Sequence, residues 1–139
     1  MNILLLEDNG TVFSFLIEEL EKLGHKIELA TKISKAIDLM EEFDSKFDCL
    51  IVDLHVDPSG LDIKNMNTYN PIWGWGWLEK YVFPKDEKWK KRTIIYSGYT
   101  QVLYSKVDKK NYKDVCIIDD KLNFDQINTF IKKIQLDLK

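Results

Sequence analysis

Short apolar runs alternate with longer amphipathic stretches along most of the chain. Unbroken apolar runs are typical of parallel strands that are covered on both faces, whereas apolar residues spaced three and four positions apart are typical of helices that bury one face. The pattern predicts five strands, at residues 3–6, 26–30, 47–52, 93–96 and 115–118. It also predicts helices over residues 12–23, 34–43, 77–83, 99–110 and 125–138.

Strands and helices that alternate in this way predict an α/β fold, an open five-stranded parallel sheet with helices on both faces. The chain of 139 residues has the usual size of one domain, so residues 1–139 are expected to form a single domain. The connection between the third and fourth strands, at residues 54–92, is longer than one helix and its loops require. We therefore expect an insertion there, ahead of a helix that ends before Pro84.

The composition excludes several classes of protein. Hydrophobic residues make up 45% of the chain, which excludes disordered and collagen-like sequences. Twenty basic and 23 acidic residues give a net charge of -3, so no direct binding to nucleic acid or to a membrane surface is expected. No apolar run approaches the roughly 18 residues of a membrane span, and the first residues lack the pattern of a secretion signal. We expect a cytoplasmic protein.

The cysteines and histidines do not form a metal-binding pattern. Cys49 and Cys116 fall in the third and fifth predicted strands, about 10 Å apart across the fourth, so we expect buried thiols and no disulfide. His25 and His55 are isolated in the sequence and are expected at the surface.

Residues 73–77 read Trp-Gly-Trp-Gly-Trp, which is the most unusual segment. Two interpretations stay open: the rings cover the enlarged loop with apolar surface, or they form a partner-binding patch, because tryptophan is common at interface hot spots. The basic segment at residues 85–92 is expected to be a solvated loop.

Polar residues follow four of the five predicted strands, at the edge of the sheet where parallel α/β proteins bind ligands. They are Glu7 and Asp8, Asp53, Ser97 and Lys121. Three carboxylates repel one another unless a cation lies among them, and oxygen ligands suit Mg²⁺. A carboxylate beside that metal can attack phosphorus and form an aspartyl phosphate, whose charge a lysine helps to neutralise.

Four segments resemble the receiver domain of two-component response regulators. They are Leu-Leu-Leu-Glu-Asp-Asn at 4–9, Leu-Ile-Val-Asp-Leu at 50–54, Ile-Ile-Tyr-Ser-Gly-Tyr at 94–99 and Ile-Ile-Asp-Asp-Lys at 117–121. The resemblance implies the flavodoxin-like receiver fold with strand order 2-1-3-4-5. It also implies a sensor histidine kinase or phosphotransfer protein as partner, and a downstream protein target that the sequence does not identify.

The resemblance assigns a role to each residue at the strand ends. Asp53 would be the phosphoacceptor, and Glu7 and Asp8 would bind Mg²⁺ together with Asp53. Ser97 and Lys121 would contact the phosphoryl group. Two further positions of the family border the water that hydrolyses the phosphoryl group, and here they are His55 and Tyr99. Both are bulky, so slow loss of the phosphoryl group is expected.

The chain departs from the family pattern around the lysine. Leu122 stands where proline is usual, and Ile118 stands where an aromatic residue is usual. Asp119 and Asp120 flank Lys121 and are expected to pair with it in the unphosphorylated state.

Three hypotheses compete for the function. The first is a single-domain response regulator, not an enzyme beyond its own phosphoryl chemistry, which signals by protein contact or onward phosphoryl transfer. The second is a degenerate receiver that binds a partner without phosphorylation. The third is another enzyme on a similar sheet: a haloacid dehalogenase-type phosphatase needs an acid where His55 stands, and the carboxylates Glu7 and Asp8 would repel the phosphate of a flavin. These residues disfavour the third class.

Overall fold

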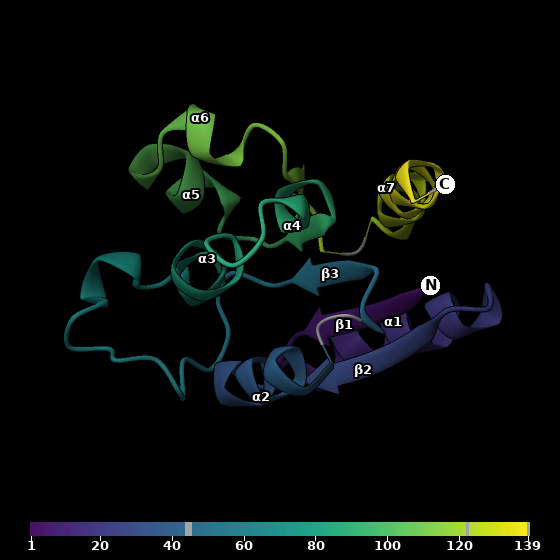
Figure 1. The fold of residues 1–139 in the computed structure, drawn as a ribbon, viewed down its shortest axis with the longest axis horizontal. Coiled ribbons are helices and arrows are strands. Elements are labelled where there is room, and N and C mark those ends of the chain that lie inside the picture. The colour runs from purple at the N-terminus through teal and green to yellow at the C-terminus, as the bar shows by residue number, and fades with distance from the viewer. Residues whose placement is uncertain (44–45, 122, 139) are drawn as a thin grey trace.

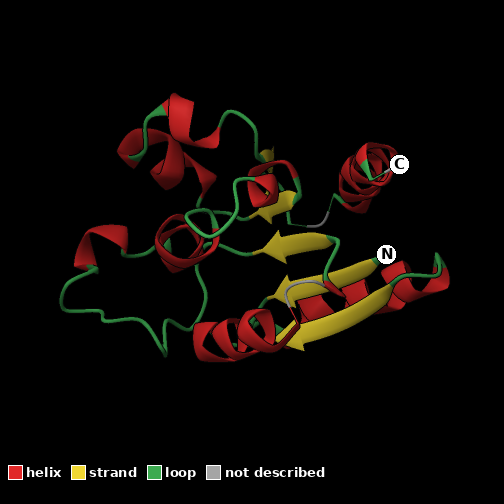
Figure 2. Cartoon of the chain, viewed as in Figure 1, coloured by secondary structure: helices red, strands yellow, loops and turns green. Residues whose placement is uncertain are grey.

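Five parallel strands form one open sheet in the computed structural model, which describes residues 1–43, 46–121 and 123–138. The strand order is β2-β1-β3-β4-β5, which confirms the predicted architecture. Helices lie on both faces of this sheet (Figures 1 and 2). The strands are β1 (Asn2–Leu6), β2 (Lys26–Ala30), β3 (Cys49–Val52), β4 (Thr93–Tyr96) and β5 (Cys116–Ile118).

Alternate residues of each strand contribute to two separate hydrophobic clusters. Ile3 and Leu5 pack with α1 (Gly10–Lys22) and α7 (Phe124–Asp137) on one face. Leu4 and Leu6 face the opposite cluster. Its helices are α2 (Ile33–Phe43), α3 (Trp73–Trp77), α4 (Lys88–Lys91) and α5 (Thr100–Lys106), followed in the chain by the short α6 (Lys109–Tyr112). Among the residues described, no helix combines the length and apolar character that a membrane crossing requires.

Several element boundaries differ from the predictions. Phe47 and Val115 are buried, but β3 and β5 begin only after them, because an apolar pattern reports burial and not strand pairing. The helix predicted over residues 99–110 is two helices, since the backbone is extended at Val107. The end of α1 agrees with the prediction: Gly24 follows it with a φ of 90°, a conformation that favours glycine.

The connection between β3 and β4 carries the insertion. Residues 54–72 extend past the carboxyl ends of the strands, at the left of Figure 1, and include the 3₁₀ turn η2 (Asn67–Tyr69). Helix α3 and the π-helical turn η3 (Leu78–Val82) follow directly. Helical structure therefore begins at Trp73, ahead of the predicted start at residue 77.

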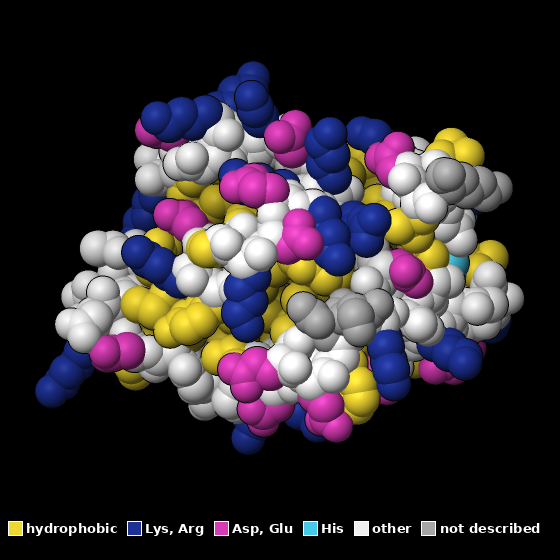
Figure 3. Space-filling model, in the orientation of Figure 1, with side chains coloured by type: hydrophobic (Ala, Val, Ile, Leu, Met, Phe, Trp, Pro, Cys, Tyr) yellow, Lys and Arg dark blue, Asp and Glu magenta, His cyan; other side chains and the backbone are white. Residues whose placement is uncertain are grey.

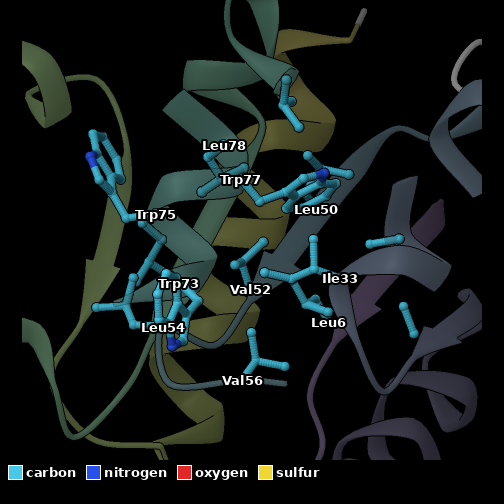
Figure 4. Close-up of a cluster of buried hydrophobic side chains, with 14 of the residues drawn as sticks. Leu6, Ile33, Leu50, Val52, Leu54, Val56, Trp73, Trp75, Trp77 and Leu78 are labelled. Atoms are coloured by element: carbon cyan, nitrogen blue, oxygen red, sulfur yellow. The ribbon is translucent and has the colours of Figure 1, made fainter. Parts of the chain in front are cut away.

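The partner-binding interpretation of the tryptophan run is wrong, because the three rings are buried. Trp73, Trp75 and Trp77 are in a helix, at most 9% exposed, and belong to the cluster on the α2 face of the sheet (Figure 4). They leave no exposed patch for a partner, and they share this cluster with Leu54 and Val56 of the enlarged loop. Burial of three large rings outweighs the low helix propensity of the glycines between them.

Further sequence predictions can be compared with the structure, and the first concerns the basic segment at residues 85–92. The basic segment contains α4, in which Trp89 is buried while the lysines beside it stay at the surface. A small hollow lies between α2 and the segment from α3 to α4, and Ile37, Met40, Trp77 and Trp89 are among the residues that line it. Hydrophobic side chains are visible at this face of the molecule in Figure 3. Cys49 and Cys116 are buried free thiols, as predicted. The predicted surface position is right for His55.

The predicted surface position is wrong for His25, which is buried. Its Nδ1 lies 3.0 Å from the amino group of Met1. Burial, together with this neighbouring positive charge, lowers the pKa of His25. The residue therefore belongs to the packing at the amino end of β1, away from the predicted site.

Candidate phosphoryl and metal site

Backbone hydrogen bonds of the sheet fix the positions of three predicted site residues. The backbone N–H of Glu7 donates to Ala30 at 3.0 Å, that of Asp53 donates to Leu6 at 3.0 Å, and that of Ser97 donates to Ile118 at 3.2 Å. Each of these bonds extends the hydrogen-bonded pairing of two neighbouring strands to the residue that directly follows one of them. Because all the strands are parallel, these residues meet at one edge of the sheet, and all three of their side chains are buried.

Three carboxylates gather at this edge. One oxygen from each of Glu7, Asp8 and Asp53 lies within 4.8 Å of the others. Asp53 Oδ1 is buried and has no hydrogen-bond partner among the residues described, while Asp8 is exposed. A buried, unpaired carboxylate oxygen is costly unless a cation or a donor takes it up. The hard oxygen donors and the open side at Asp8 fit a Mg²⁺ ion, which binds few protein ligands and keeps several waters.

Lys121 reaches into the acidic cluster. Its Nζ lies 2.7 Å from Asp53 Oδ2 and 3.1 Å from Glu7 Oε1. Burial disfavours the ammonium, but the two carboxylates outweigh this effect and raise the pKa of Lys121. Among the contacts described, Asp119 does not form the predicted ion pair with Lys121. Its Oδ1 instead accepts a hydrogen bond from the Tyr104 hydroxyl at 3.1 Å.

Glu7 is the most constrained of the three acids. Its Oε1 accepts hydrogen bonds from Lys121 and, at 3.2 Å, from the Tyr96 hydroxyl. Its Oε2 accepts from the backbone N–H of Asp8 at 3.0 Å. Burial and the adjacent Asp53 raise the pKa of Glu7 to about 7. The sequence does not reveal the contact with Tyr96, because a tyrosine in an apolar run is indistinguishable from an ordinary core aromatic.

Ser97 and Tyr99 meet where β4 leads into α5. The Ser97 Oγ accepts a hydrogen bond from the Tyr99 backbone N–H at 3.0 Å. The ring of Tyr99 packs against His55 from the loop after β3, with the ring centroids 4.6 Å apart and the planes tilted by 54°. Both rings are exposed. The two residues predicted to border the hydrolytic water thus lie together, one from each loop beside Asp53.

The insertion also touches the site, which the sequence does not indicate. The backbone N–H of Asp57 donates to Asp8 Oδ2 at 3.1 Å. Gly74 of α3 lies directly on Asp53: a Cβ atom at this position would be 2.2 Å from the Asp53 carbonyl oxygen. Only glycine permits this approach. In the sequence, the glycines between the tryptophans are the available signal, and the first of them marks this close backbone contact.

Comparisons with known proteins agree with this architecture. No protein-family model and no curated protein matches the chain. Among solved structures, TrrA of Thermotoga maritima in complex with Mg²⁺-BeF is 20% identical, with a TM-score of 0.69 over 96% of this chain and 97% of that chain. The HemR receiver domain of Leptospira biflexa is 18% identical, with a TM-score of 0.62 over 96% and 92%. The chain therefore has the flavodoxin-like fold of response regulator receiver domains.

Proposed function

We propose that this chain is a response regulator receiver that accepts a phosphoryl group on Asp53, with Mg²⁺ held by Glu7, Asp8 and Asp53. The observation that carries the proposal is the state of the Asp53 carboxylate, which has one buried, unpaired oxygen and one oxygen 2.7 Å from Lys121. Such a carboxylate is oriented and in reach of both a cation and an ammonium. TrrA, which shares the fold, has been solved in complex with the histidine kinase ThkA, which supports a histidine kinase or phosphotransfer protein as the donor.

The proposed reaction is a single displacement at phosphorus. A carboxylate oxygen of Asp53 forms the new bond to phosphorus as the bond from phosphorus to the imidazole nitrogen of a donor phosphohistidine breaks, and the electron pair stays on that nitrogen. When bound, Mg²⁺ supplies positive charge next to the phosphoryl oxygens. Lys121 turns from Asp53 toward the phosphoryl group, and the Ser97 hydroxyl leaves the Tyr99 N–H to donate to a phosphoryl oxygen.

The first test is direct labelling of the protein. Incubation with Mg²⁺ and acetyl phosphate is expected to add one phosphoryl group to the intact mass, and removal of the metal by a chelator is expected to prevent it. Asp53→Asn should abolish labelling, whereas the control Asp62→Asn, an exposed acid of the insertion, should leave it unchanged. Labelling of Asp53→Asn to the parent's extent would disprove the assignment.

The two remaining acids are expected to differ in their effect on Mg²⁺ affinity. Asp8 is exposed and faces solvent, while both oxygens of Glu7 already accept protein hydrogen bonds. We expect Asp8→Asn to weaken Mg²⁺ binding about 100-fold and Glu7→Gln about tenfold, as measured by isothermal titration calorimetry. Equal losses in the two variants would contradict this ranking.

A degenerate receiver is the second candidate function, and one observation favours it. Ile118 is buried at the position where the family carries an aromatic switch residue, so the usual coupled movement of hydroxyl and ring has no ring to use. In that case the chain binds a partner whatever the state of Asp53. The labelling experiment separates the two, because a degenerate receiver gains no mass. A labelled receiver, in contrast, would signal by protein contact or onward transfer, and we propose no activity on other substrates.

A further inference from the structure

Tyr96 is a polar side chain in an otherwise apolar strand. It is fully buried in β4, directly before Ser97, and packs in the cluster that contains Leu5 and Ile51 on the α1 face of the sheet. Glu7 lies two residues after Leu5, and side chains two positions apart along a strand share a face. The topology thus places Tyr96 and Glu7 on the same side of the sheet.

Only a long side chain can connect these two residues. β3 lies between β1 and β4, and two inter-strand steps amount to about 10 Å. The Tyr96 hydroxyl reaches across and donates to Glu7 Oε1 at 3.2 Å. An aliphatic residue at this position would fill the same core but would leave Glu7 Oε1 with Lys121 as its remaining described donor.

The same Glu7 oxygen therefore has one fixed donor and one movable donor. Tyr96 is anchored as the last residue of β4, where it pairs with Ile118 of β5, whereas Lys121 comes from the loop after β5 and is shared with Asp53. If Lys121 turns toward a phosphoryl group on Asp53, Glu7 Oε1 loses that donor. A buried carboxylate oxygen without a donor is destabilising, and the Tyr96 hydroxyl prevents this.

We infer that Tyr96 is a positioning residue of the proposed phosphoryl site: its hydroxyl fixes the Glu7 carboxylate beside Asp8 and Asp53 independently of where Lys121 points. This inference rests on the proposed function. Groups that orient the ligands of a metal affect its affinity without touching it. Tyr96 therefore tunes Mg²⁺ binding and phosphorylation, and it does so from the core side of the sheet.

The test is Tyr96→Phe, which removes the hydroxyl and keeps the ring. We expect circular dichroism to show an intact fold, and titration calorimetry to show Mg²⁺ affinity weakened about fivefold, with slower labelling of Asp53 by acetyl phosphate. The matched control is Tyr104→Phe, which loses a tyrosine hydrogen bond to a different carboxylate, Asp119. It should bind Mg²⁺ as the parent does.

A double-mutant cycle with Glu7→Gln separates positioning from simple core stability. In the Glu7→Gln background, Tyr96→Phe should change Mg²⁺ affinity less than twofold, because the carboxylate it positions is absent. Unchanged Mg²⁺ affinity in Tyr96→Phe alone, or an equal loss in both backgrounds, would overturn the inference while a labelled parent leaves the proposed function standing. A parent that neither binds Mg²⁺ nor takes up the phosphoryl group would overturn both.

Discussion

Gly74→Ala is expected to destabilise the protein by about 2–3 kcal/mol and to slow phosphorylation of Asp53. The added Cβ would be 2.2 Å from the Asp53 carbonyl oxygen and 3.0 Å from a methyl carbon of Val52. The backbone has little freedom to move away, because the Gly74 N–H donates to the Leu54 carbonyl at 2.9 Å and β3 is paired on both sides. The clash is therefore relieved only by shifting α3 or the end of β3, which carries Asp53.

Urea unfolding, together with the rate of labelling by acetyl phosphate, measures both effects. The control is Gly98→Ala, since this glycine also adjoins a site residue, Ser97, but among the described residues only its chain neighbours lie within 4 Å of its Cβ position. Its free energy of unfolding should change by less than about 1 kcal/mol. If the two variants were equally stable, close packing of α3 on Asp53 would be refuted.

The phosphoryl group on Asp53 is expected to decay slowly in the parent and about tenfold faster in the double variant His55→Asn, Tyr99→Glu. Hydrolysis requires a water in line with phosphorus, opposite the Asp53 oxygen. The packed rings of His55 and Tyr99 come from the two loops beside Asp53, and neither carries an acid or amide to orient that water. Smaller and more polar side chains at the two positions should admit and orient it.

Intact mass after removal of acetyl phosphate follows this decay. Tyr81→Glu serves as the control because it places the same charge at an exposed tyrosine of η3. Its decay should match that of the parent. Decay in the double variant that is no faster than in the parent would show that these rings do not limit access of water.

Much of the site could be predicted from the sequence because its residues mark abrupt changes in the hydrophobic pattern. Glu7, Asp53 and Ser97 each end an apolar run, and the parallel arrangement of the strands then brings them to one edge. Lys121 lies at this edge as predicted, but its contact with Glu7, which is 114 positions away, has no signal in the local sequence, where Asp119 is the nearer acid.

The remaining features depend on tertiary packing that a local pattern does not contain. Helix α3 has a poor local propensity and forms because its tryptophans are buried against β3. The contact of Gly74 with Asp53 and that of Asp57 with Asp8 join the insertion to the site, and neither has a sequence signature beyond a glycine. The hydroxyl of Tyr96 has a function only because Glu7 lies two strands away on the same face.

The long connection between β3 and β4 also has a consequence for the order of folding. β1, β2 and β3 with their two helices come from residues 2–52 and close short loops, whereas β4 pairs with β3 only after some 40 intervening residues are ordered. Glu7 and Asp8 belong to this amino-terminal part and Asp53 follows it directly, whereas the ammonium of Lys121 and the hydroxyl of Ser97 come from the carboxy-terminal part. Until β4 and β5 join the sheet, these carboxylates lack Lys121 and Ser97, so we expect the chain to become competent for phosphoryl transfer only once both strands are in place.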